Sequence, residues 1–320
     1  MTLALSSFPP QEYAAWRAGF LARRAAGPRM RGLDPGLAKA RAERNNGTLL
    51  PAAGPAPNAE VLEVMDGAGR RGTIVLFWPA STAAQVGDLA IDPADAAEVR
   101  ELVTARVRVA GAESLSLNVV AVEPATSAFV AGQAYDVIAT QMQLDLGHVQ
   151  TDDRADDRAD DRAARVVVRP MTAAEVAAYF ATAVEVFAEE TMAADPLLGR
   201  EDAVEGAERL HEQLLPQGAG TPGHDFLVAE DAGDRRRVGH LWLFHEGRAG
   251  FVYDVEVDTA ERGRGYGRAL MELAAGRCRG LGLEVLGLNV FGHNTVARGL
   301  YDALGYVAVD EAVRLRLSRP

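Results

Sequence analysis

The residues best suited to chemistry in this chain lie in one glycine-rich hexapeptide, Arg262-Gly-Arg-Gly-Tyr-Gly267. Glycine at every second position lets the backbone turn sharply and approach a ligand closely. An apolar, strand-like run at 251–257 precedes the hexapeptide and a helix-like run at 268–279 follows it. Successive N–H groups at a helix N-terminus converge on an anion, so this order is typical of a phosphate-binding loop. Glycine-rich turns also occur for steric reasons, and the hexapeptide alone leaves both interpretations open.

A second motif follows about twenty residues later, after the strand-like run at 284–290. In this order, the two motifs resemble the GNAT superfamily of acyl-CoA-dependent N-acyltransferases. The pyrophosphate loop of that family, (Gln/Arg)-x-x-Gly-x-(Gly/Ala), is matched by Arg262, Gly265 and Gly267. The second signature of the family is matched by Asn294, Ala297, Leu300-Tyr301 and Leu304-Gly305-Tyr306.

The resemblance implies an α/β fold of the α+β kind, in which helices flank a mixed, mostly antiparallel sheet. Acetyl-CoA, the co-substrate, is expected in a V-shaped opening between two splayed parallel strands, the first of them at 251–257. The sequence disfavours a nicotinamide dinucleotide, because its binding fold needs an acidic residue about twenty positions beyond the glycines. Here the corresponding strand ends Leu288-Asn289-Val290, without a carboxylate.

The resemblance assigns cofactor binding to the loop and to the strand before it. Backbone groups of Val255 and Val257 are expected to pair with the pantetheine arm, and an N–H near Val255 to polarise the thioester carbonyl. Asn294 either bonds the pantetheine or caps the following helix. The expected cofactor-binding residues are Val255, Val257, Arg262, Gly263, Arg264, Gly265, Tyr266, Gly267, Arg268 and Asn294.

Tyr301 is the expected proton donor, because CoA leaves as a thiolate and the family usually places a tyrosine at this position. A second group must take a proton from the incoming ammonium. Asp254 and Glu256 share one strand face, with Tyr253 on the other by strict alternation. Either carboxylate is a candidate base, acts through water, or anchors a cationic substrate.

Two further side chains are candidates on the acceptor side. His293 has an intrinsic pKa suited to proton transfer, and Asn289 is suited to orienting a substrate. The single cysteine, Cys278, falls on a helical stripe with apolar residues and is expected to be buried rather than nucleophilic. We therefore expect direct attack in a ternary complex.

The composition limits the partners. Net charge is -12, with 45 acidic against 33 basic residues, which disfavours nucleic acid and favours a cationic small molecule. No uncharged apolar stretch reaches about 18 residues, and residues 1–7 lack the features of a signal peptide, so we expect a cytoplasmic protein without a membrane span. The six histidines show no paired ligand spacing and one cysteine builds no cluster, so no metal is expected.

Three copies of Asp-Asp-Arg-Ala mark the clearest boundary in the chain. Because they contain no apolar residue larger than alanine, they are expected to form a solvated linker. The sequence thus predicts a domain at 1–150, a charged linker at 151–164 and a second domain at 165–320. Apolar runs align in order between the two domains, which predicts one fold used twice.

The first copy lacks the second copy's cofactor motifs. Asp92 and Asn118 are 26 positions apart, whereas Asp258 and Asn289 are 31 apart, and the missing five residues fall at the glycine loop. Glu123 and Val130 stand where the second copy has Asn294 and Tyr301. Residues 1–150 are therefore expected to be a degenerate, non-catalytic GNAT-like domain, and residues 165–320 the catalytic one.

These observations predict an N-acetyltransferase that transfers an acetyl group from acetyl-CoA to a primary amine of a small-molecule or peptide acceptor. A degenerate first domain before an intact second domain is similar to the layout of the mycothiol synthases, so acetylation of a cysteinyl amine is one alternative. A non-catalytic acyl-CoA-binding regulatory module is another. The sequence leaves the acceptor, the base, the acyl-chain selectivity and the oligomeric state unassigned.

Overall fold

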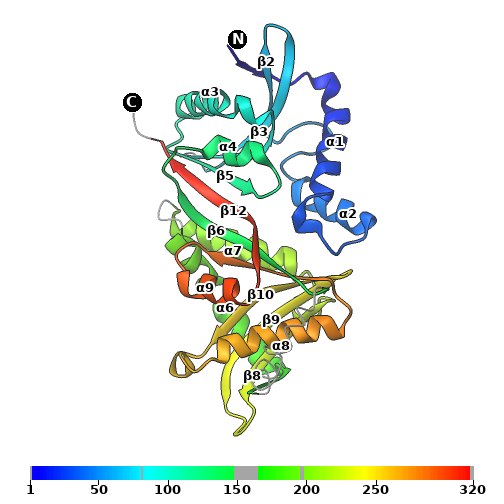
Figure 1. The fold of residues 1–320 in the computed structure, drawn as a ribbon, viewed down its shortest axis with the longest axis vertical. Coiled ribbons are helices and arrows are strands. Elements are labelled where there is room, and N and C mark those ends of the chain that lie inside the picture. Colours follow the sequence, from blue (N-terminus) through cyan, green and yellow to red (C-terminus); the bar gives the residue numbers. More distant parts are fainter. Residues whose placement is uncertain (1, 81, 148–164, 195–197, 318–320) are drawn as a thin grey trace. The chain divides into compact units, whose positions relative to one another are not determined.

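The computed structural model describes residues 2–80, 82–147, 165–194 and 198–317 (Figure 1). The chain divides into two compact units, Met1–Thr140 with Ala308–Pro320 as unit 1, and Gln141–Val307 as unit 2. The predicted linker at 151–164 lies outside the described residues. Each unit is a mostly antiparallel sheet with helices packed on it, which confirms the fold class predicted from the sequence.

Unit 1 builds its sheet in the order β1-β2-β3-β4-β5-β12. Only β4 and β5 run parallel among the strand pairs described for this unit. Its last strand, β12, comes from the C-terminal end of the chain and pairs antiparallel with β5. The elements are β1 (Ala4–Ser7), α1 (Tyr13–Ala25), α2 (Pro35–Asn46), β2 (Ala59–Asp66), β3 (Gly69–Ala80), β4 (Ala83–Ala90), α3 (Ala96–Val109), β5 (Ser114–Val120), α4 (Pro124–Val130) and β12 (Val307–Arg316).

Unit 2 repeats this plan in the strand order β7-β8-β9-β10-β11. In Figure 1 the orange helix α8 crosses the yellow strands of this unit. The strand β6 (Asp136–Asp145) leads from unit 1 into unit 2. The elements are β7 (Val166–Pro170), α6 (Ala173–Ala194), α7 (Arg200–Leu214), β8 (His224–Asp231), β9 (Arg237–Glu246), β10 (Ala249–Val257), α8 (Tyr266–Gly280), β11 (Val285–Phe291) and α9 (Thr295–Ala303).

One parallel strand pair opens at the same place in each unit. In unit 2, β10 and β11 pair from Ala249↔Val285 to Val252↔Leu288, and both strands then continue without pairing to each other. In unit 1, β4 and β5 pair from Ala83↔Ser114 to Val86↔Leu117 and then do the same. This is the splay expected from the resemblance, and its repetition bears out the predicted duplication.

The sheet of unit 2 has two different faces because side chains alternate along β9. Leu241 and Leu243 are fully buried in an aliphatic core under α8 and α9. His240 and Trp242 point to the opposite face, where α6 covers an aromatic layer. Met142, at the end of β6, is fully buried in the aliphatic core of unit 2.

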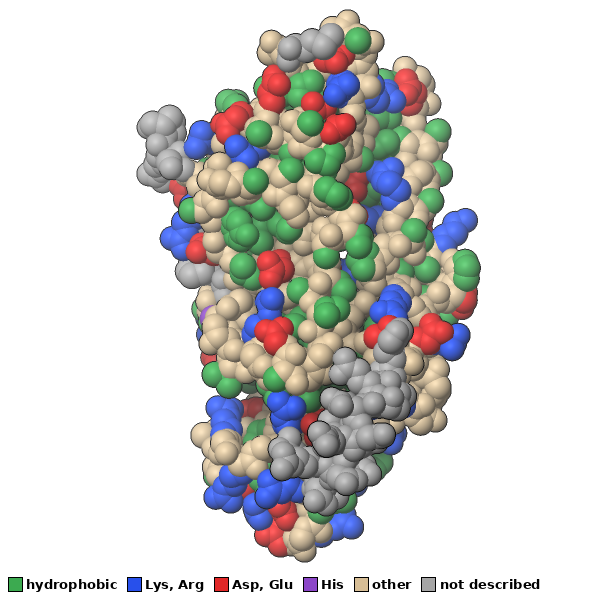
Figure 2. All heavy atoms as spheres, in the orientation of Figure 1, with side chains coloured by type: hydrophobic (Ala, Val, Ile, Leu, Met, Phe, Trp, Pro, Cys, Tyr) green, Lys and Arg blue, Asp and Glu red, His purple; other side chains and the backbone are tan. Residues whose placement is uncertain are grey.

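Two surface properties complete the description. Figure 2 shows basic side chains interleaved with acidic ones on the face it presents. Within the described part of the chain, no helix is long and apolar enough to cross a membrane.

Candidate active site

The glycine loop connects the open end of β10 to the first turn of α8. A short 3-10 turn, Thr259–Glu261, leads into it, and Gly265 is the residue just before the helix. Gly263 and Gly265 have φ of 76° and 87°, a left-handed conformation that residues with a side chain rarely adopt. These two glycines are therefore required by the backbone itself. The loop places the first N–H groups of α8 beyond the end of β10, the strand that has separated from β11.

Gly267 differs from these two glycines, because its backbone does not require glycine. It lies inside the first turn of α8, and a Cβ placed there would meet Leu300 at 3.6 Å and Val257 at 3.8 Å. Both are ordinary van der Waals distances, so the fold itself accommodates a methyl group at this position. This agrees with the family motif, which admits alanine as well as glycine here.

Ion pairs and hydrogen bonds fix the start of α8. Arg236 donates to Glu261 at 2.9 Å and to the Tyr266 hydroxyl at 2.9 Å. That hydroxyl donates to Asp231 at 2.5 Å, and the Tyr266 side chain is buried. The loop is therefore held to the turn between β8 and β9, which preorganises its backbone donors.

The predicted arginines of the loop all contact carboxylates of the chain. Arg262 donates to the Val257 carbonyl at 3.1 Å and to Glu256 at 3.2 Å. Arg264 pairs with Glu261 at 3.3 Å, and Arg268 pairs with Glu272 at 3.6 Å along α8. These cations are positioned at the loop while their charges are partly compensated.

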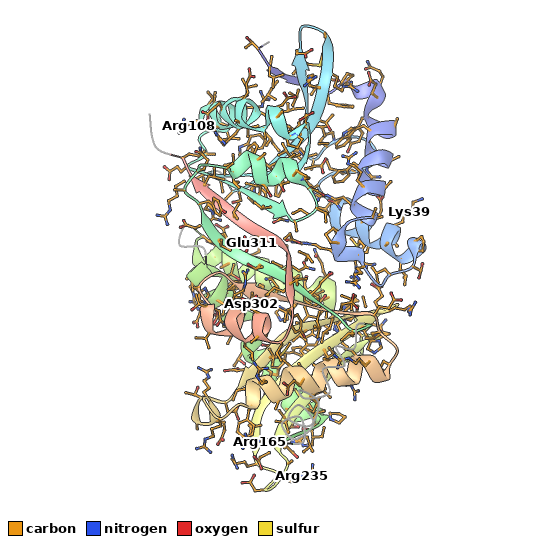
Figure 3. All side chains as sticks on the ribbon, viewed as in Figure 1. Lys39, Arg108, Arg165, Arg235, Asp302 and Glu311 are labelled. Carbon is orange, nitrogen blue, oxygen red and sulfur yellow. The ribbon has the colours of Figure 1, made fainter. Side chains whose placement is uncertain are left out.

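A cavity of about 590 Å³ lies beside the loop and is lined by Arg264, Tyr266, Arg165 and the β8–β9 turn at 231–233. Figure 3 labels Arg165, just before β7, at the same end of unit 2 as Arg235 of that turn. The Arg165 carbonyl accepts from Ala232 N–H at 2.9 Å, which fixes its backbone. Sequence reasoning missed Arg165, because it lies a hundred residues before the loop and outside both motifs.

The open edge of β10 presents the backbone groups predicted to bind pantetheine. Asp258 N–H donates to Val238 on β9 at 2.9 Å. Since N–H and C=O groups alternate in direction along a strand, Val255 and Val257 direct theirs away from β9, toward the opening. The Val257 carbonyl is already bonded by Arg262. Tyr253 is the extra residue of a β-bulge in β10, in its pairing with β9. The bulge increases the local twist where β10 separates from β11.

The bulge also corrects the predicted placement of Tyr253. Strict alternation put Tyr253 opposite Asp254, but its ring packs on Trp242 at 4.9 Å, on the α6 face. Asp254 lies on that same face, where it accepts from Tyr179 of α6. The extra residue in the bulge breaks the period of two, so two successive side chains share one face.

Asp254 is the centre of a hydrogen-bond network that the sequence did not reveal. Its Oδ2 accepts from the Tyr179 hydroxyl at 2.9 Å and is 2.8 Å from His240 Nε2. Partial burial alone would raise the pKa of Asp254, but the His240 and Tyr179 hydrogen bonds outweigh it and hold the pKa below its ordinary value. Glu256 is exposed and contacts Arg262 instead, so the two carboxylates have different surroundings.

Tyr301 lies on α9 and is 7% exposed. Burial, with a smaller contribution from the Asp254 carboxylate, raises the pKa of its phenol to about 12. Its ring is 5.8 Å from that of Tyr306. The Asp254 carboxylate is near enough to contribute to this shift. Tyr301 therefore keeps its proton across the ordinary working range of pH.

The remaining predicted residues lie near the end of β11. Asn294 caps α9, accepting from Ala297 N–H at 3.1 Å. His293 is exposed and its Nε2 is 2.9 Å from Glu190 of α6. Asn289 is exposed between buried neighbours on β11.

Cys278 lies on α8 and is fully buried. Burial raises the pKa of its thiol to about 11, which is unsuited to a nucleophile.

Unit 1 differs from unit 2 at the glycine loop and at the positions of Asn294 and Tyr301. Its 3-10 turn, Pro93–Asp95, runs directly into α3, without the glycine loop. Glu123, in place of Asn294, makes no side-chain cap, and Val130, in place of Tyr301, is buried.

Two further features bear on the site. A second cavity, of about 680 Å³, lies between α6 and the strands β7 and β8, and its lining includes none of the predicted site residues. Across the residues with described positions, no group of three or more His, Cys, Asp or Glu side chains is arranged to hold a metal ion.

Comparison with known proteins identifies the family. Residues 189–306 match the family model described as "Acetyltransferase (GNAT) family". The chain is 32% identical over 152 residues to the uncharacterized N-acetyltransferase YdgE of Bacillus subtilis. The aligned region covers 46% of this chain and 95% of that protein. The chain belongs to the GNAT family of acetyltransferases. It is an acyltransferase, and members of this family use acetyl-CoA and an amine acceptor.

Two other similarities concern the tandem layout. The solved structure of a tandem GNAT protein from the clavulanic acid biosynthesis pathway aligns with a TM-score of 0.53 at 17% identity, covering 99% of both chains. It shares the fold over the whole length. A mycothiol acetyltransferase of Sanguibacter keddieii is 33% identical over 135 residues, which span 40% of each chain.

Proposed function

We propose that unit 2, which holds most of the domain predicted at 165–320, is the catalytic domain of an acetyl-CoA-dependent N-acetyltransferase, and that unit 1, which holds most of the domain predicted at 1–150, is a non-catalytic domain of the same fold. One observation carries this proposal. The glycine loop of unit 2 holds the N-terminus of α8 beyond the end of β10, the strand that has separated from β11. Backbone N–H groups suited to binding a phosphate therefore follow directly on an open strand edge. Unit 1 has the open strand pair without the loop.

In the proposed complex, the N–H groups at the start of α8 bind the pyrophosphate of acetyl-CoA, with Arg262, Arg264 and Arg268 contributing positive charge. The backbone groups of Val255 and Val257 that face the opening pair with the pantetheine amides as an added strand would. Asn294 supports this arrangement by holding the start of α9.

The reaction is direct transfer within the ternary complex. The neutral amine nitrogen attacks the thioester carbonyl carbon, a C–N bond forms and the C–S bond breaks. Before attack, the acceptor ammonium gives one proton to a base or to water on the α6 face. During transfer, Tyr301 donates its proton to the departing CoA thiolate, and the second proton lost by the amine nitrogen restores the Tyr301 phenol. Asp254 and Glu256 are the carboxylates available on that face.

Calorimetric titration of the full chain with acetyl-CoA tests the cofactor part of the proposal. We expect one site, lost in Gly265→Glu, whose side chain adds a like charge beside the pyrophosphate. Two sites would contradict the assignment of unit 1, and no binding would contradict the assignment of the loop. Acetyl transfer is then measured as CoA thiol release over a panel of primary amines.

A cysteinyl amine is the second candidate acceptor, supported by the partial match to mycothiol acetyltransferases. Cysteinamide and serinamide form a matched pair of probes that differ only in the thiol. A preference for cysteinamide of tenfold or more in kcat/KM would favour this acceptor class, and equal rates would count against it. A regulatory module that binds acetyl-CoA without transferring it would release no CoA thiol with any amine.

A further inference from the structure

The duplication supplies an internal comparison for the carboxylate at the opening. Gly87 is the bulge residue of β4, as Tyr253 is of β10, and each follows the last residue paired to the parallel neighbour. Asp88 and Asp254 come next. The two aspartates therefore occupy the same position in the two units, at the mouth of the same strand pair.

In unit 1 this aspartate is neutralised by the protein itself. Asp88 accepts from Arg23 of α1 at 2.8 Å, and Arg24 lies 4.0 Å from its other oxygen. Arg24 also donates to the Gly87 carbonyl. The Asp88 side chain is only 9% exposed. Guanidinium groups thus fill the space in front of the carboxylate and cover it.

In unit 2 the equivalent aspartate has no arginine or lysine partner among the described residues. It contacts the Tyr179 hydroxyl and His240, and the Asp254 side chain stays 40% exposed. His240 is 5% exposed and its Nδ1 is buried without a hydrogen-bond partner in the described part of the chain.

We propose that Asp254 is a cation-binding site that takes the ammonium group of the acceptor, in the place that arginine occupies in unit 1. This rests on the proposed function and assigns Asp254 the anchoring role rather than that of the base. Tyr179 and His240 are positioning residues, since both donate to one oxygen and hold the ionised carboxylate in a fixed orientation.

The surroundings suit an organic cation. The Tyr179 ring lies 5.2 Å from His240 and 6.4 Å from Trp242, and Tyr253 packs on the same tryptophan. Aromatic rings and a carboxylate together favour alkylammonium or guanidinium over sodium. Glu256, the neighbouring carboxylate on this face, contacts Arg262 and is already compensated. Asp254 is thus the carboxylate of this pair that has no arginine or lysine partner among the described residues.

Anchoring also agrees with the direction of the Asp254 pKa. A carboxylate whose pKa is held below the ordinary range is a weak proton acceptor, but it stays ionised throughout the working range of pH. The bound ammonium then loses its proton to water or another group on this face before attack. The carboxylate holds the amine nitrogen near the opening in the meantime.

Guanidinium and urea test the site even while the acceptor is unidentified, because they are planar, alike in size and differ in charge. Each is titrated at millimolar concentration and constant ionic strength into the full chain labelled with ¹⁵N, and the Trp242 indole N–H is followed by NMR. Trp242 pairs directly across from Asp254, and the chain has three tryptophans, so Trp242→Phe assigns the signal. Ethylammonium is titrated as the second cation.

We expect saturable shifts with guanidinium and ethylammonium, and none with urea. In Asp254→Asn the cation affinity should fall at least tenfold, whereas Glu256→Gln, the matched control on the same face, should leave it within twofold. Shifts that do not saturate in the natural chain, or that are equal for urea, would overturn the proposal whether or not Asp254→Asn folds. Unchanged affinity in a folded Asp254→Asn would also overturn it.

This result is independent of the cofactor measurement. A chain that binds acetyl-CoA and gives no cation response would disprove the anchor and leave the proposed acetyltransferase standing. A chain that responds to cations and binds no acetyl-CoA would disprove the proposed acetyltransferase and, with it, the assignment of the cation to an acceptor ammonium, leaving only a cation site at Asp254. Once an acceptor is found, Asp254→Asn should raise its KM at least tenfold with kcat lowered less than threefold, whereas a base would show the opposite division.

Discussion

Replacing Tyr301 with phenylalanine removes one hydroxyl from the site and little else. Among the residues described, no hydrogen bond is made by this hydroxyl to another side chain or to the backbone, and the ring keeps its contact with Tyr306. The free energy of unfolding should therefore change by less than about 1 kcal/mol. Acetyl-CoA affinity should also be retained, because the glycine loop and the β10 edge are untouched.

The expected loss is in turnover. General acid assistance contributes about 10²–10⁴-fold, so kcat should fall by that factor, which corresponds to roughly 3–5 kcal/mol in the barrier. With the Tyr301 pKa at about 12, less than about 1% of the phenol is ionised at pH 9. The natural enzyme should therefore show no loss of rate from Tyr301 ionisation as pH rises from 7 to 9.

Stopped assays of CoA thiol release, with acetyl-CoA affinity measured in parallel, separate the two effects. Tyr306→Phe is the matched control, because its buried hydroxyl has no partner within the described part of the structure. It should leave kcat within twofold and the protein as stable or about 1 kcal/mol more stable. An unchanged kcat in Tyr301→Phe, or equal losses in both variants, would refute the assignment of Tyr301 as the proton donor.

Two further predictions concern the loop and the core of unit 2. Gly267→Ala should leave thermal stability unchanged or slightly higher and acetyl-CoA affinity within about threefold, since the fold accommodates the methyl group and the family's loop motif admits alanine at this position. Gly263→Ala, at a φ of 76°, should instead lower thermal stability and weaken acetyl-CoA binding, and equal behaviour of the two variants in calorimetry would contradict the loop assignment. Met142→Ala, at a fully buried position in the aliphatic core of unit 2, should cost about 2–5 kcal/mol in denaturant unfolding, and a cost below about 1 kcal/mol would show that β6 contributes little to that core.

Local sequence determined the features that depend on short-range geometry. Positive φ angles strongly favour glycine, so Gly263 and Gly265 predict a tight turn between a strand and a helix, and the second motif was needed to predict what the turn binds. The helix that follows, the splayed strand before it and the second motif are contiguous in the chain, and each was predicted where the structure has it. The family resemblance rests on these same segments.

Tertiary structure decided what depends on residues far apart in the chain. The partners of Asp254 come from α6 and β9, which lie 75 and 14 positions away, and no local pattern connects Tyr179 with His240. The bulge that brings Tyr253 to the face of Asp254 appears only in the pairing with β9, because an extra residue is defined relative to a partner strand. The pairing of β12 with β5 likewise joins segments about two hundred residues apart. The sequence by itself thus determined the motifs and the kind of cofactor they suit, whereas only packing decided that one aspartate is covered by arginine and its copy is left open.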